Sequence, residues 1–436
     1  MAEYFSGIDK IQYKGPDSDD PLSFRHYNPG EKIEGKTMKE HLRFAVAYWH
    51  TYCNGCADQF GDATRQMPWE SDDPMETARN KIAANFEFCE KLGVDYYCFH
   101  DRDVAPEGRD FAETCDNLDL IAEVMKSEQE RTGIVPLWGT ANLFSNPRFM
   151  HGAGTSCNAD VFAYAAAQVA KAMEITHKLG GSGYVFWGGR EGYKSLLNTE
   201  IGRELDHMAL LLKLAVDHKK KIGFKGQFYI EPKPKEPTKH QYDFDVATVY
   251  GFLQKYGLDK DFKMNVEANH ATLAGHSFVH ELQVSAVNGI LGSVDANRGD
   301  LLLGWDTDQF PNDLVECAMA MLTIMDAGGF TTGGLNFDAH VHRESIEPVD
   351  LFHSHIGAMD TFARGLKIAA AIKADGKLEK HVRQRYASWD SGTGEEIEAG
   401  KKSMADLHEY MLKKGNPDPN ESGRVEMLEN LVSSYI

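Results

Sequence analysis

Acidic residues recur in this sequence at the points where short hydrophobic runs end. Glu231 closes the run 227–231, Glu267 closes the run 263–267, and His270 follows three residues later. Oxygen ligands with a single imidazole and no cysteine are typical of sites for Mg²⁺, Mn²⁺ or Co²⁺ rather than of structural zinc sites. The sequence therefore predicts a site for divalent cations, and its candidate ligands are Glu231, Glu267, His270, Asp295, Asp306, Asp308 and Asp338.

The charge of these candidates favours two cations over one. Carboxylates that lie within a few ångströms of one another oppose joint ionisation. The six carboxylates and Lys233 leave a net charge of −1 when two divalent cations are added, and of −3 when only one is added. A single acid at a strand end is more often a helix N-cap or a solvated loop residue. Acids at the ends of four successive runs favour metal binding over that alternative.

A lysine and a histidine–aspartate pair lie at similar positions and are candidates for catalysis. Lys233 stands between Pro232 and Pro234, which stiffen the loop, so it either polarises a carbonyl oxygen or only balances charge. His100 and Asp103 form either a pair ready for proton transfer, in which the acid sets the tautomer, or a buried structural pair. Six other histidines have no comparable context and are interpreted as surface or packing residues: His276, His280, His340, His342, His353 and His355.

Three tryptophans, Trp49, Trp138 and Trp187, stand at or near the ends of other hydrophobic runs. Flat apolar faces beside polar groups suit sugars, which present C–H faces as well as hydroxyl groups, and they exclude water. Each tryptophan taken alone fits a core position equally well. No phosphate-binding or dinucleotide-binding glycine loop is present.

The elements that must position these residues alternate in type from about residue 40 to residue 375. A short β-branched or aromatic run, a polar loop and a long amphipathic stretch follow one another eight times. This pattern predicts an α/β fold of the (β/α)₈ TIM-barrel type, in which the carboxyl ends of all strands face the active site. The predicted strands are 44–49, 96–100, 135–140, 183–187, 227–231, 263–267, 292–295 and 335–338. The predicted helices are 76–92, 111–131, 159–179, 198–221, 245–256, 277–287, 313–325 and 349–372.

The domain organisation follows from where this alternation begins and ends. Residues 1–39 are predicted to be an N-terminal extension and residues 40–375 the catalytic barrel. Residues 376–436 lose the strand pattern and contain too little apolar sequence for a core of their own. They are predicted to be a C-terminal helical arm that contacts another subunit.

Composition limits the partners of this chain of 436 residues. There are 66 acidic and 46 basic residues, and the formal net charge of −20 argues against general affinity for nucleic acid or anionic membranes. No apolar run reaches the length of a membrane span, and no secretory signal is recognisable. Seven scattered cysteines do not form a disulfide framework, and the pair Cys53 and Cys56 lacks a second pair at zinc-finger spacing. A cytoplasmic protein with reduced thiols is expected.

Six segments of the sequence carry a recognisable pattern: Phe99-His-Asp-Arg-Asp103, Trp187-Gly-Gly-Arg-Glu-Gly192, Tyr229-Ile-Glu-Pro-Lys-Pro234, Asn265-Val-Glu-Ala-Asn-His270, Gly304-Trp-Asp-Thr-Asp308 and Asn336-Phe-Asp-Ala339. Together they resemble the xylose isomerases, specifically the longer-chain group with an N-terminal extension. The similarity covers essentially the whole chain, and the segments occur in the order of the predicted strands. One difference is Gln59, because many members have proline before the phenylalanine that is Phe60 here.

This resemblance implies a homotetrameric aldose–ketose isomerase with two divalent metal ions (Mg, Mn or Co) per subunit. Its substrate would be D-xylose, converted to D-xylulose, with D-glucose and D-fructose interconverted less efficiently. One ion would be bound by Glu231, Glu267, Asp295 and Asp338, and the other by Glu267, His270, Asp306 and Asp308.

The resemblance also implies roles for the remaining candidates. His100, oriented by Asp103, would assist the opening of the sugar ring. The metals and Lys233 would polarise the sugar oxygens while a hydride moves between C1 and C2. The substrate-binding wall would consist of Trp49, Phe60, Trp138, Thr140 and Trp187, with Phe60 lent to a neighbouring subunit.

Two other functions compete with this interpretation. A metal-dependent hydrolase of the same barrel architecture would use a metal-bound hydroxide on a phosphodiester. The acidic balance, the aromatic residues and the scarcity of basic residues near the strand ends oppose it. A non-catalytic barrel stabilised by metal would need neither Lys233 nor the pair of His100 and Asp103.

Overall fold

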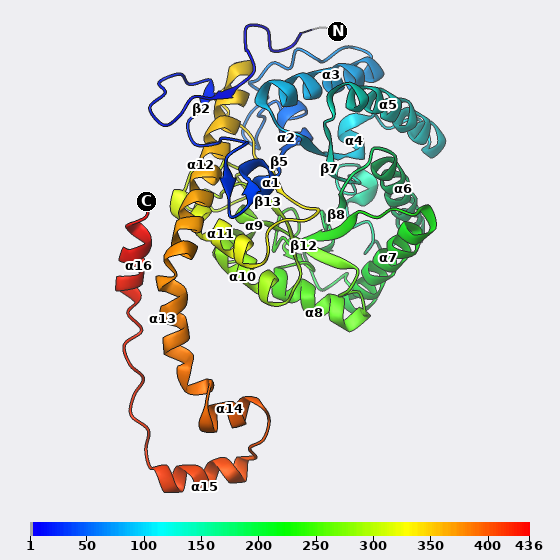
Figure 1. The fold of residues 1–436 in the computed structure, drawn as a ribbon. Helices are drawn as coiled ribbons and strands as arrows, with labels where there is room; N and C mark the ends of the chain where they lie inside the picture. Colours follow the sequence, from blue (N-terminus) through cyan, green and yellow to red (C-terminus); the bar gives the residue numbers. More distant parts are fainter. Residues whose placement is uncertain (1–2) are drawn as a thin grey trace.

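Eight parallel strands close into a barrel in the computed structural model, which describes residues 3–436 (Figure 1). Each strand pairs in parallel with the strand that precedes it in this set, and β10 pairs with both β8 and β12. The predicted barrel is therefore confirmed. The strands are β5 (Phe44–Ala47), β6 (Tyr96–His100), β7 (Val135–Thr140), β8 (Gly183–Trp187), β10 (Gln227–Glu231), β12 (Phe262–Glu267), β13 (Leu291–Asp295) and β14 (Leu335–Phe337).

Eight long helices surround the barrel (Figure 1). Most of their starts carry side-chain caps, such as Asp73 before α3 and Asp110 before α5, which accept backbone N–H groups of the first turn. Gly93 and Gly133 end the same two helices in the left-handed conformation that glycine tolerates best. The helices are α3 (Pro74–Leu92), α5 (Phe111–Thr132), α6 (Ala159–Lys178), α7 (Ile201–Ile222), α8 (Val246–Tyr256), α10 (Phe278–Val287), α11 (Leu314–Asp326) and α12 (Pro348–Asp375).

Three short helices begin where strands end and turn side chains over the mouth of the barrel: α2 (Tyr48–Tyr52), α4 (Asp101–Val104) and α9 (Ala268–Leu273). The prediction that the first strand continues to Trp49 is wrong, since β5 ends at Ala47. Its neighbour β14 ends at Phe337, opposite Val46, so the chain beyond Ala47 has no strand partner on that side. As a consequence, Trp49 and His50 lie on a helical turn above the barrel.

The segment before the barrel packs against its amino end rather than standing apart. Phe5 and Phe24 belong to the main hydrophobic core. The carboxylate of Asp360 on α12 accepts the backbone N–H groups of residues 25–27 at 2.7–2.8 Å. The elements of this segment are β1 (Gln12–Tyr13), β2 (Ser23–Phe24), β3 (Lys32–Ile33), β4 (Lys36–Thr37) and α1 (Met38–Leu42).

The C-terminal segment leaves the barrel at the end of α12, extends away from it and returns (Figure 1). None of its helices contains a buried residue. Its end contacts α12 again, where the Arg364 guanidinium donates to the Ile436 carbonyl at 2.8 Å. Its elements are α13 (Lys377–Tyr386), η2 (Ala387–Trp389), α14 (Gly392–Glu398), α15 (Met404–Lys414) and α16 (Val425–Ser433).

A buried carboxylate holds the loops above β7 and β8 together. Glu191 accepts the backbone N–H groups of Ala153, Gly154 and Thr155 at 2.8–3.1 Å. The next residues form β9 (Gly192–Tyr193), which pairs with β11 (His240–Gln241), and the single turn η1 is Pro147–Phe149. Among residues 3–436, none of the helices combines the length and the hydropathy needed to span a bilayer.

Candidate metal centre and active site

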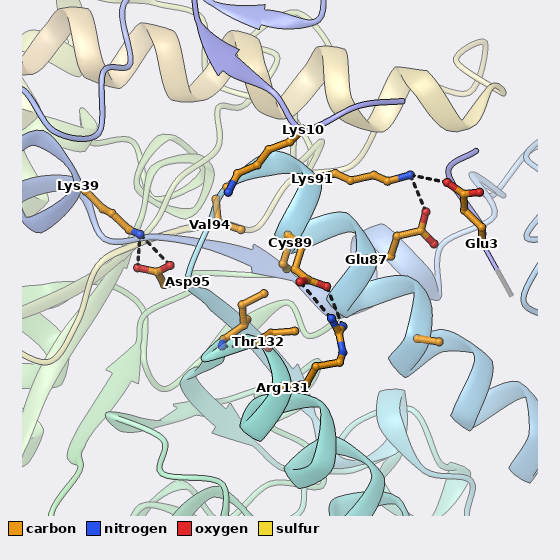
Figure 2. A pocket seen from close by; sticks show the side chains of 14 residues that line it. Glu3, Lys10, Lys39, Glu87, Cys89, Lys91, Val94, Asp95, Arg131 and Thr132 are labelled. Carbon is orange, nitrogen blue, oxygen red and sulfur yellow. Dashed lines mark hydrogen bonds and ion pairs between the residues drawn. The ribbon is translucent and has the colours of Figure 1, made fainter. Parts of the chain in front are cut away.

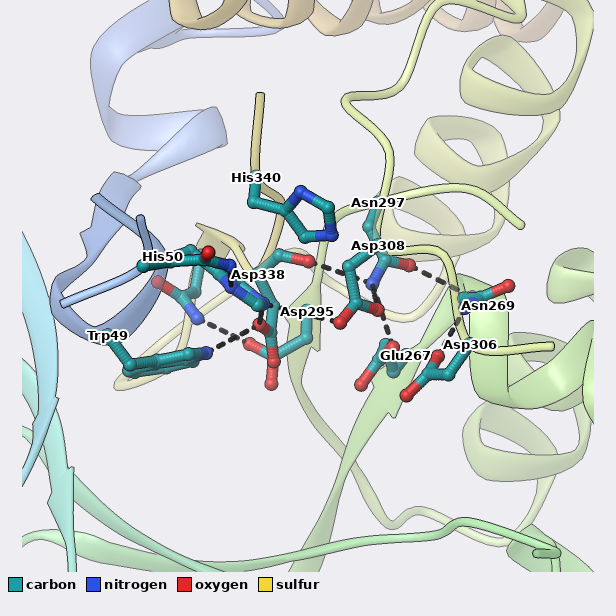
Figure 3. A network of polar contacts seen from close by, with 12 residues as sticks. Trp49, His50, Glu267, Asn269, Asp295, Asn297, Asp306, Asp308, Asp338 and His340 are labelled. Carbon is teal, nitrogen blue, oxygen red and sulfur yellow. Dashed lines mark hydrogen bonds and ion pairs between the residues drawn. The ribbon is translucent and has the colours of Figure 1, made fainter. Parts of the chain in front are cut away.

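The structure brings all seven predicted ligands together at the carboxyl end of the barrel. Figure 3 shows five of them, Glu267, Asp295, Asp306, Asp308 and Asp338. Glu231, Glu267 and Asp295 are the last residues of three neighbouring strands, and each is at least 95% buried. The remaining four come from adjacent segments: Asp338 directly after β14, Asp306 and Asp308 from the loop between β13 and α11, and His270 from α9.

These side chains form two overlapping sets. Ligand atoms of Glu231, Glu267, Asp295 and Asp338 lie within 4.8 Å of one another. Ligand atoms of Glu267, Asp306 and Asp308 do the same, so Glu267 belongs to both sets. The Nε2 atom of His270 lies 3.5 Å from Asp306 Oδ2, beside the second set. Two cations sharing Glu267 fit this arrangement.

Burial and mutual repulsion work against the ionised form of most of these acids. Burial, reinforced by neighbouring carboxylates, raises the pKa of Asp295 to about 7 and that of Asp308 to about 6. The same two causes raise the pKa values of Glu231 and Glu267 well above the ordinary value. The protein thus concentrates acids without enough positive charge of its own, which is the condition that a bound cation relieves.

For two of the acids, positive neighbours outweigh the effect of burial on the pKa. Burial raises the pKa of Asp306, but the charges of His270 and Lys233 outweigh it and hold that pKa well below the ordinary value. Burial acts in the same direction on Asp338, and hydrogen bonds and the charge from His50 lower its pKa below the ordinary value. Positive side chains of the protein therefore neutralise only part of the negative charge of this cluster.

One orphaned nitrogen supports a cation between these groups. His270 Nδ1 is buried and has no hydrogen-bond partner among the described residues. It lies 2.9 Å from Glu267 Oε2 and 3.6 Å from Glu231 Oε1, without the alignment of a hydrogen bond. Electron-pair donors that lie this close without a hydrogen bond between them are placed to share one cation. The donor set therefore fits a divalent ion.

Three asparagines that the sequence analysis did not assign hold the acids in place. Asn265 Nδ2 donates to Asp295 at 2.7 Å, and Asn336 Nδ2 donates to the other oxygen of Asp295 at 2.8 Å. Asn297 Nδ2 donates to Glu267 at 2.7 Å and to Asp308 at 3.1 Å. The signal was available in part, because Asn265 is two residues from Glu267 and successive odd positions of a strand share one face.

His50 is a second residue that the sequence analysis missed. Its Nε2 atom lies 2.8 Å from Asp338 Oδ1 and 3.3 Å from Asp308 Oδ2, so it links the two ligand sets (Figure 3). Burial alone would lower the pKa of His50, but these two carboxylates raise it to about 10. Trp49 Nε1 also donates to Asp338, at 2.8 Å. Trp49 and His50 are consecutive residues on the turn of α2, which explains why both side chains reach Asp338.

A cavity of about 170 Å³ opens beside the acids. It is lined by Trp49, Trp138, Thr140 and Trp187, whose role in substrate binding stays a prediction, and by Phe144, which was not predicted. Phe144 packs edge-on against Trp187, with ring centroids 4.6 Å apart. The wall is apolar on one side and faces the carboxylates on the other.

Phe60 is the one predicted wall residue that the structure does not bring to this cavity. Its side chain is 80% exposed and does not line the cavity of its own chain. Its assignment to a neighbouring subunit stays a prediction.

His100 and Lys233, the candidates for proton transfer and polarisation, also line the cavity. His100 Nδ1 lies 2.8 Å from Asp103 Oδ2, which also accepts the His100 backbone N–H. Burial would lower the pKa of His100, but Asp103 raises it above the ordinary value. The Lys233 ammonium is hydrogen-bonded to Asp306 and lies 5.3 Å from the ring centre of Trp187.

A larger cavity, of about 610 Å³, lies between the N-terminal segment, the end of α3 and the end of α5 (Figure 2). Most of its charged residues pair with one another: Lys91 contacts Glu3 and Glu87, and Arg131 contacts Glu90. None of the candidate cation-binding groups formed by residues 3–436 lies in it. Size alone therefore does not mark the active site of this protein.

Comparison with known proteins decides the family. The chain is 59% identical to the xylose isomerase of Rhodopirellula baltica over 433 residues, which are 99% of each chain. It is 57% identical to the xylose isomerases of Thermoanaerobacterium thermosaccharolyticum and Thermotoga maritima, over 100% of this chain and 99% and 98% of theirs. The chain belongs to the xylose isomerase family.

The family assignment confirms the resemblance inferred from the motifs. Xylose isomerases are aldose–ketose isomerases, and the alternative of a phosphodiester hydrolase is not supported. A family model described as the XylA2 C-terminal domain matches residues 382–436. Among solved structures, the apo form of 3-keto-D-glucoside 4-epimerase from E. coli has a TM-score of 0.49 at 12% identity, over 73% of this chain and 99% of that one.

Proposed function

We propose that this xylose isomerase interconverts D-xylose and D-xylulose, and D-glucose and D-fructose less efficiently, with two divalent cations at the barrel mouth. The observation that carries the proposal is the pair of acid clusters sharing Glu267 beside an aromatic cavity that also contains Lys233. The carboxylates that line this cavity would repel the long anionic substrate of a phosphodiester hydrolase.

The residues fit two cations of the Mg²⁺, Mn²⁺ or Co²⁺ class. One would be bound by Glu231, Glu267, Asp295 and Asp338, and the other by Glu267, His270, Asp306 and Asp308. When bound, such ions supply Lewis-acid polarisation of the sugar oxygens. The asparagines keep the acids oriented for that purpose, as outer partners do in other metal sites.

His100 handles the proton of ring opening in this proposal. A carboxylate can only accept, so the contact with Asp103 places the hydrogen of the neutral ring on Nδ1 and leaves Nε2 as the acceptor. Nε2 then takes the proton of the anomeric hydroxyl as the ring C–O bond breaks, and a proton returns to the ring oxygen.

Lys233 and the aromatic wall serve the open-chain sugar. The Lys233 ammonium donates a hydrogen bond to the sugar's carbonyl oxygen while the hydride moves between C1 and C2. Trp49 and Trp187 exclude water, which would compete for the carbonyl and the cations. The direct contact of Lys233 with Asp306, a candidate metal ligand, supports a position of the ammonium group near both the sugar carbonyl and the cations.

The test is conversion of D-xylose by metal-stripped protein after addition of Mg²⁺, Mn²⁺ or Co²⁺, with D-xylulose measured. Glu267→Gln is expected to abolish turnover and metal uptake while the protein stays folded. The matched control is Glu128→Gln, at a buried glutamate paired with Arg131 away from the mouth. Full turnover by Glu267→Gln, or equal loss in both variants, would contradict the proposal.

Ring opening has its own test. His100→Asn is expected to slow the ring-closed aldose more than an open-chain analogue. An equal loss on both substrates would remove His100 from the ring-opening step and leave it a structural role.

We also propose a homotetramer in the cytoplasm. The C-terminal segment has no buried residue in its helices within one chain, and Phe60 projects from the surface, so both have surface available for another subunit. None of the seven cysteines forms a disulfide, which suits a reducing compartment. Light scattering of the full chain and of a truncation ending at residue 381 tests the assembly, and the truncation is expected to form smaller oligomers.

A further inference from the structure

A second group of side chains of the types that bind metals lies outside the barrel mouth, where the amino ends of α8 and α10 meet. His276 precedes Ser277, the N-cap of α10, and His280 and Glu281 follow within the first turns. One ligand atom from each of His276, His280 and Glu281 lies within 4.8 Å of the others. The sequence analysis interpreted both histidines as surface or packing residues, and it is the start of α10 that brings them together.

The ring of His276 is already oriented by an acid. Its Nε2 atom lies 3.1 Å from Oδ2 of Asp245, the N-cap of α8. Because a carboxylate can only accept a hydrogen bond, Nε2 carries the hydrogen and Nδ1 keeps its lone pair. A histidine whose second nitrogen donates to a carboxylate is the usual arrangement of a metal-binding histidine.

Glu281 supplies a buried carboxylate. It is 3% exposed, and its Oε2 atom accepts the backbone N–H of Val246 at 2.8 Å. Burial, followed by the charge of Asp245, raises the pKa of Glu281 above the ordinary value. One oxygen is thus anchored to the start of α8, and the other is left to bind a cation.

We propose that His276, His280 and Glu281 bind a borderline divalent cation, with Zn²⁺ as the preferred ion, at a site separate from the barrel mouth. Two imidazoles and one carboxylate favour Zn²⁺ over Mg²⁺, in contrast to the oxygen-rich set at the mouth. A tetrahedral zinc with bonds of about 2.0–2.1 Å places its ligands about 3.4 Å apart. The exposed His280 closes the remaining gap by rotation, and water completes the coordination.

Such an ion would tie together segments that are distant in sequence. Glu281 and Asp245 already join the starts of α10 and α8, and His276 ends the loop that leaves α9, the helix of His270. The site would therefore stabilise the surroundings of the barrel mouth without contributing a ligand to it.

The test is equilibrium dialysis of the full chain against micromolar free Zn²⁺ in excess Mg²⁺, with zinc per chain measured by elemental analysis. His276→Ala and His280→Ala are each expected to bind one zinc fewer than the unaltered protein, with unchanged Mg²⁺-dependent isomerisation of D-xylose. The matched control is His353→Ala, at an exposed histidine that belongs to no such group, and it is expected to bind as much zinc as the unaltered protein.

Substitution of Asp245, the acid that orients His276, tests whether these side chains bind metal or only lie close together. Asp245→Asn keeps a side chain that can cap α8 but no longer enforces the hydrogen on His276 Nε2, so zinc affinity is expected to fall about 10- to 100-fold. Unchanged affinity in this variant would contradict the role of Asp245 as an orienting residue.

The outcomes distinguish this site from the barrel mouth. Glu267→Gln is expected to retain the zinc that His280→Ala loses, whether or not the protein isomerises D-xylose. If His280→Ala binds as much zinc as the unaltered protein, or if His353→Ala loses the same amount, the proposed zinc site is wrong. Neither result would affect the proposed isomerase function.

Discussion

Stripping divalent cations from the protein is expected to lower its melting temperature by an amount that grows with pH. At a free metal concentration of about 100 times the dissociation constant, each bound cation adds about 2.7 kcal/mol to the free energy of unfolding. Two cations at the barrel mouth therefore add roughly 5 kcal/mol. An unfolding entropy of about 2.1 cal/mol/K per residue over a chain of 436 residues converts this to a shift of about 6 °C.

The pH dependence follows from the acids of the cluster. The pKa of Asp295 is raised from 3.8 to about 7 and that of Asp308 from 3.8 to about 6. Between pH 3.8 and about 7, the folded, metal-free protein holds more protons than the unfolded chain. Its stability therefore falls as the pH rises through this range. Cations bind the ionised acids, and protons compete with them below about pH 6. The shift on chelation should thus be small near pH 5 and full near pH 8.

Differential scanning calorimetry with a chelator or with excess Mg²⁺, at about pH 5 and about pH 8, measures this shift. Glu267→Gln serves as the control, because loss of the shared acid should leave the melting temperature insensitive to chelation at both pH values. An equal shift at both pH values, or none at pH 8, would refute the reasoning that these acids are gathered around cations.

Three further substitutions test parts of the site. Asn297→Leu removes the donor shared by two acids and is expected to weaken Co²⁺ binding about 10- to 100-fold in calorimetric titration. His50→Gln removes the positive group between Asp308 and Asp338, so it should destabilise the chelated protein by about 3–5 kcal/mol and the Mg²⁺-loaded protein by less, as measured by thermal unfolding. Glu191→Ala leaves three buried N–H groups without their acceptor, and is expected to lower stability by roughly 3 kcal/mol with unchanged Co²⁺ affinity.

Much of the fold was predictable because its signals are local. The strand that ends in Glu231 contains the continuous apolar run 228–230, which is buried, and its observed bounds match the predicted ones. The helices begin at capping residues such as Asp110 and end at glycines such as Gly133, both of which are readable from neighbouring residues. The first strand was predicted to continue to Trp49, which is wrong. Its end depends on a residue distant in sequence, because the neighbouring β14 ends at Phe337.

The acids of the candidate site were predictable from the sequence, but the residues that hold these acids in place were not. Barrel geometry alone places Glu267 and Asp295 at one face, since parallel strands direct their carboxyl ends the same way. The contact of His50 with Asp338 depends on the turn of α2, and no spacing in the sequence encodes it. The cluster around His276 depends likewise on how α8 meets α10.

The sequence by itself therefore determined the barrel, the face on which its acids gather and the family to which the chain belongs. Periodicity and motifs carry that information, because strand and helix preferences act over a few residues at a time. Only the tertiary structure decided which donors hold each acid, that His50 joins the two ligand sets, and that His276 and His280 meet beside Glu281. Those contacts join residues from separate loops, and their geometry is set by packing between elements rather than by the preferences of any one segment.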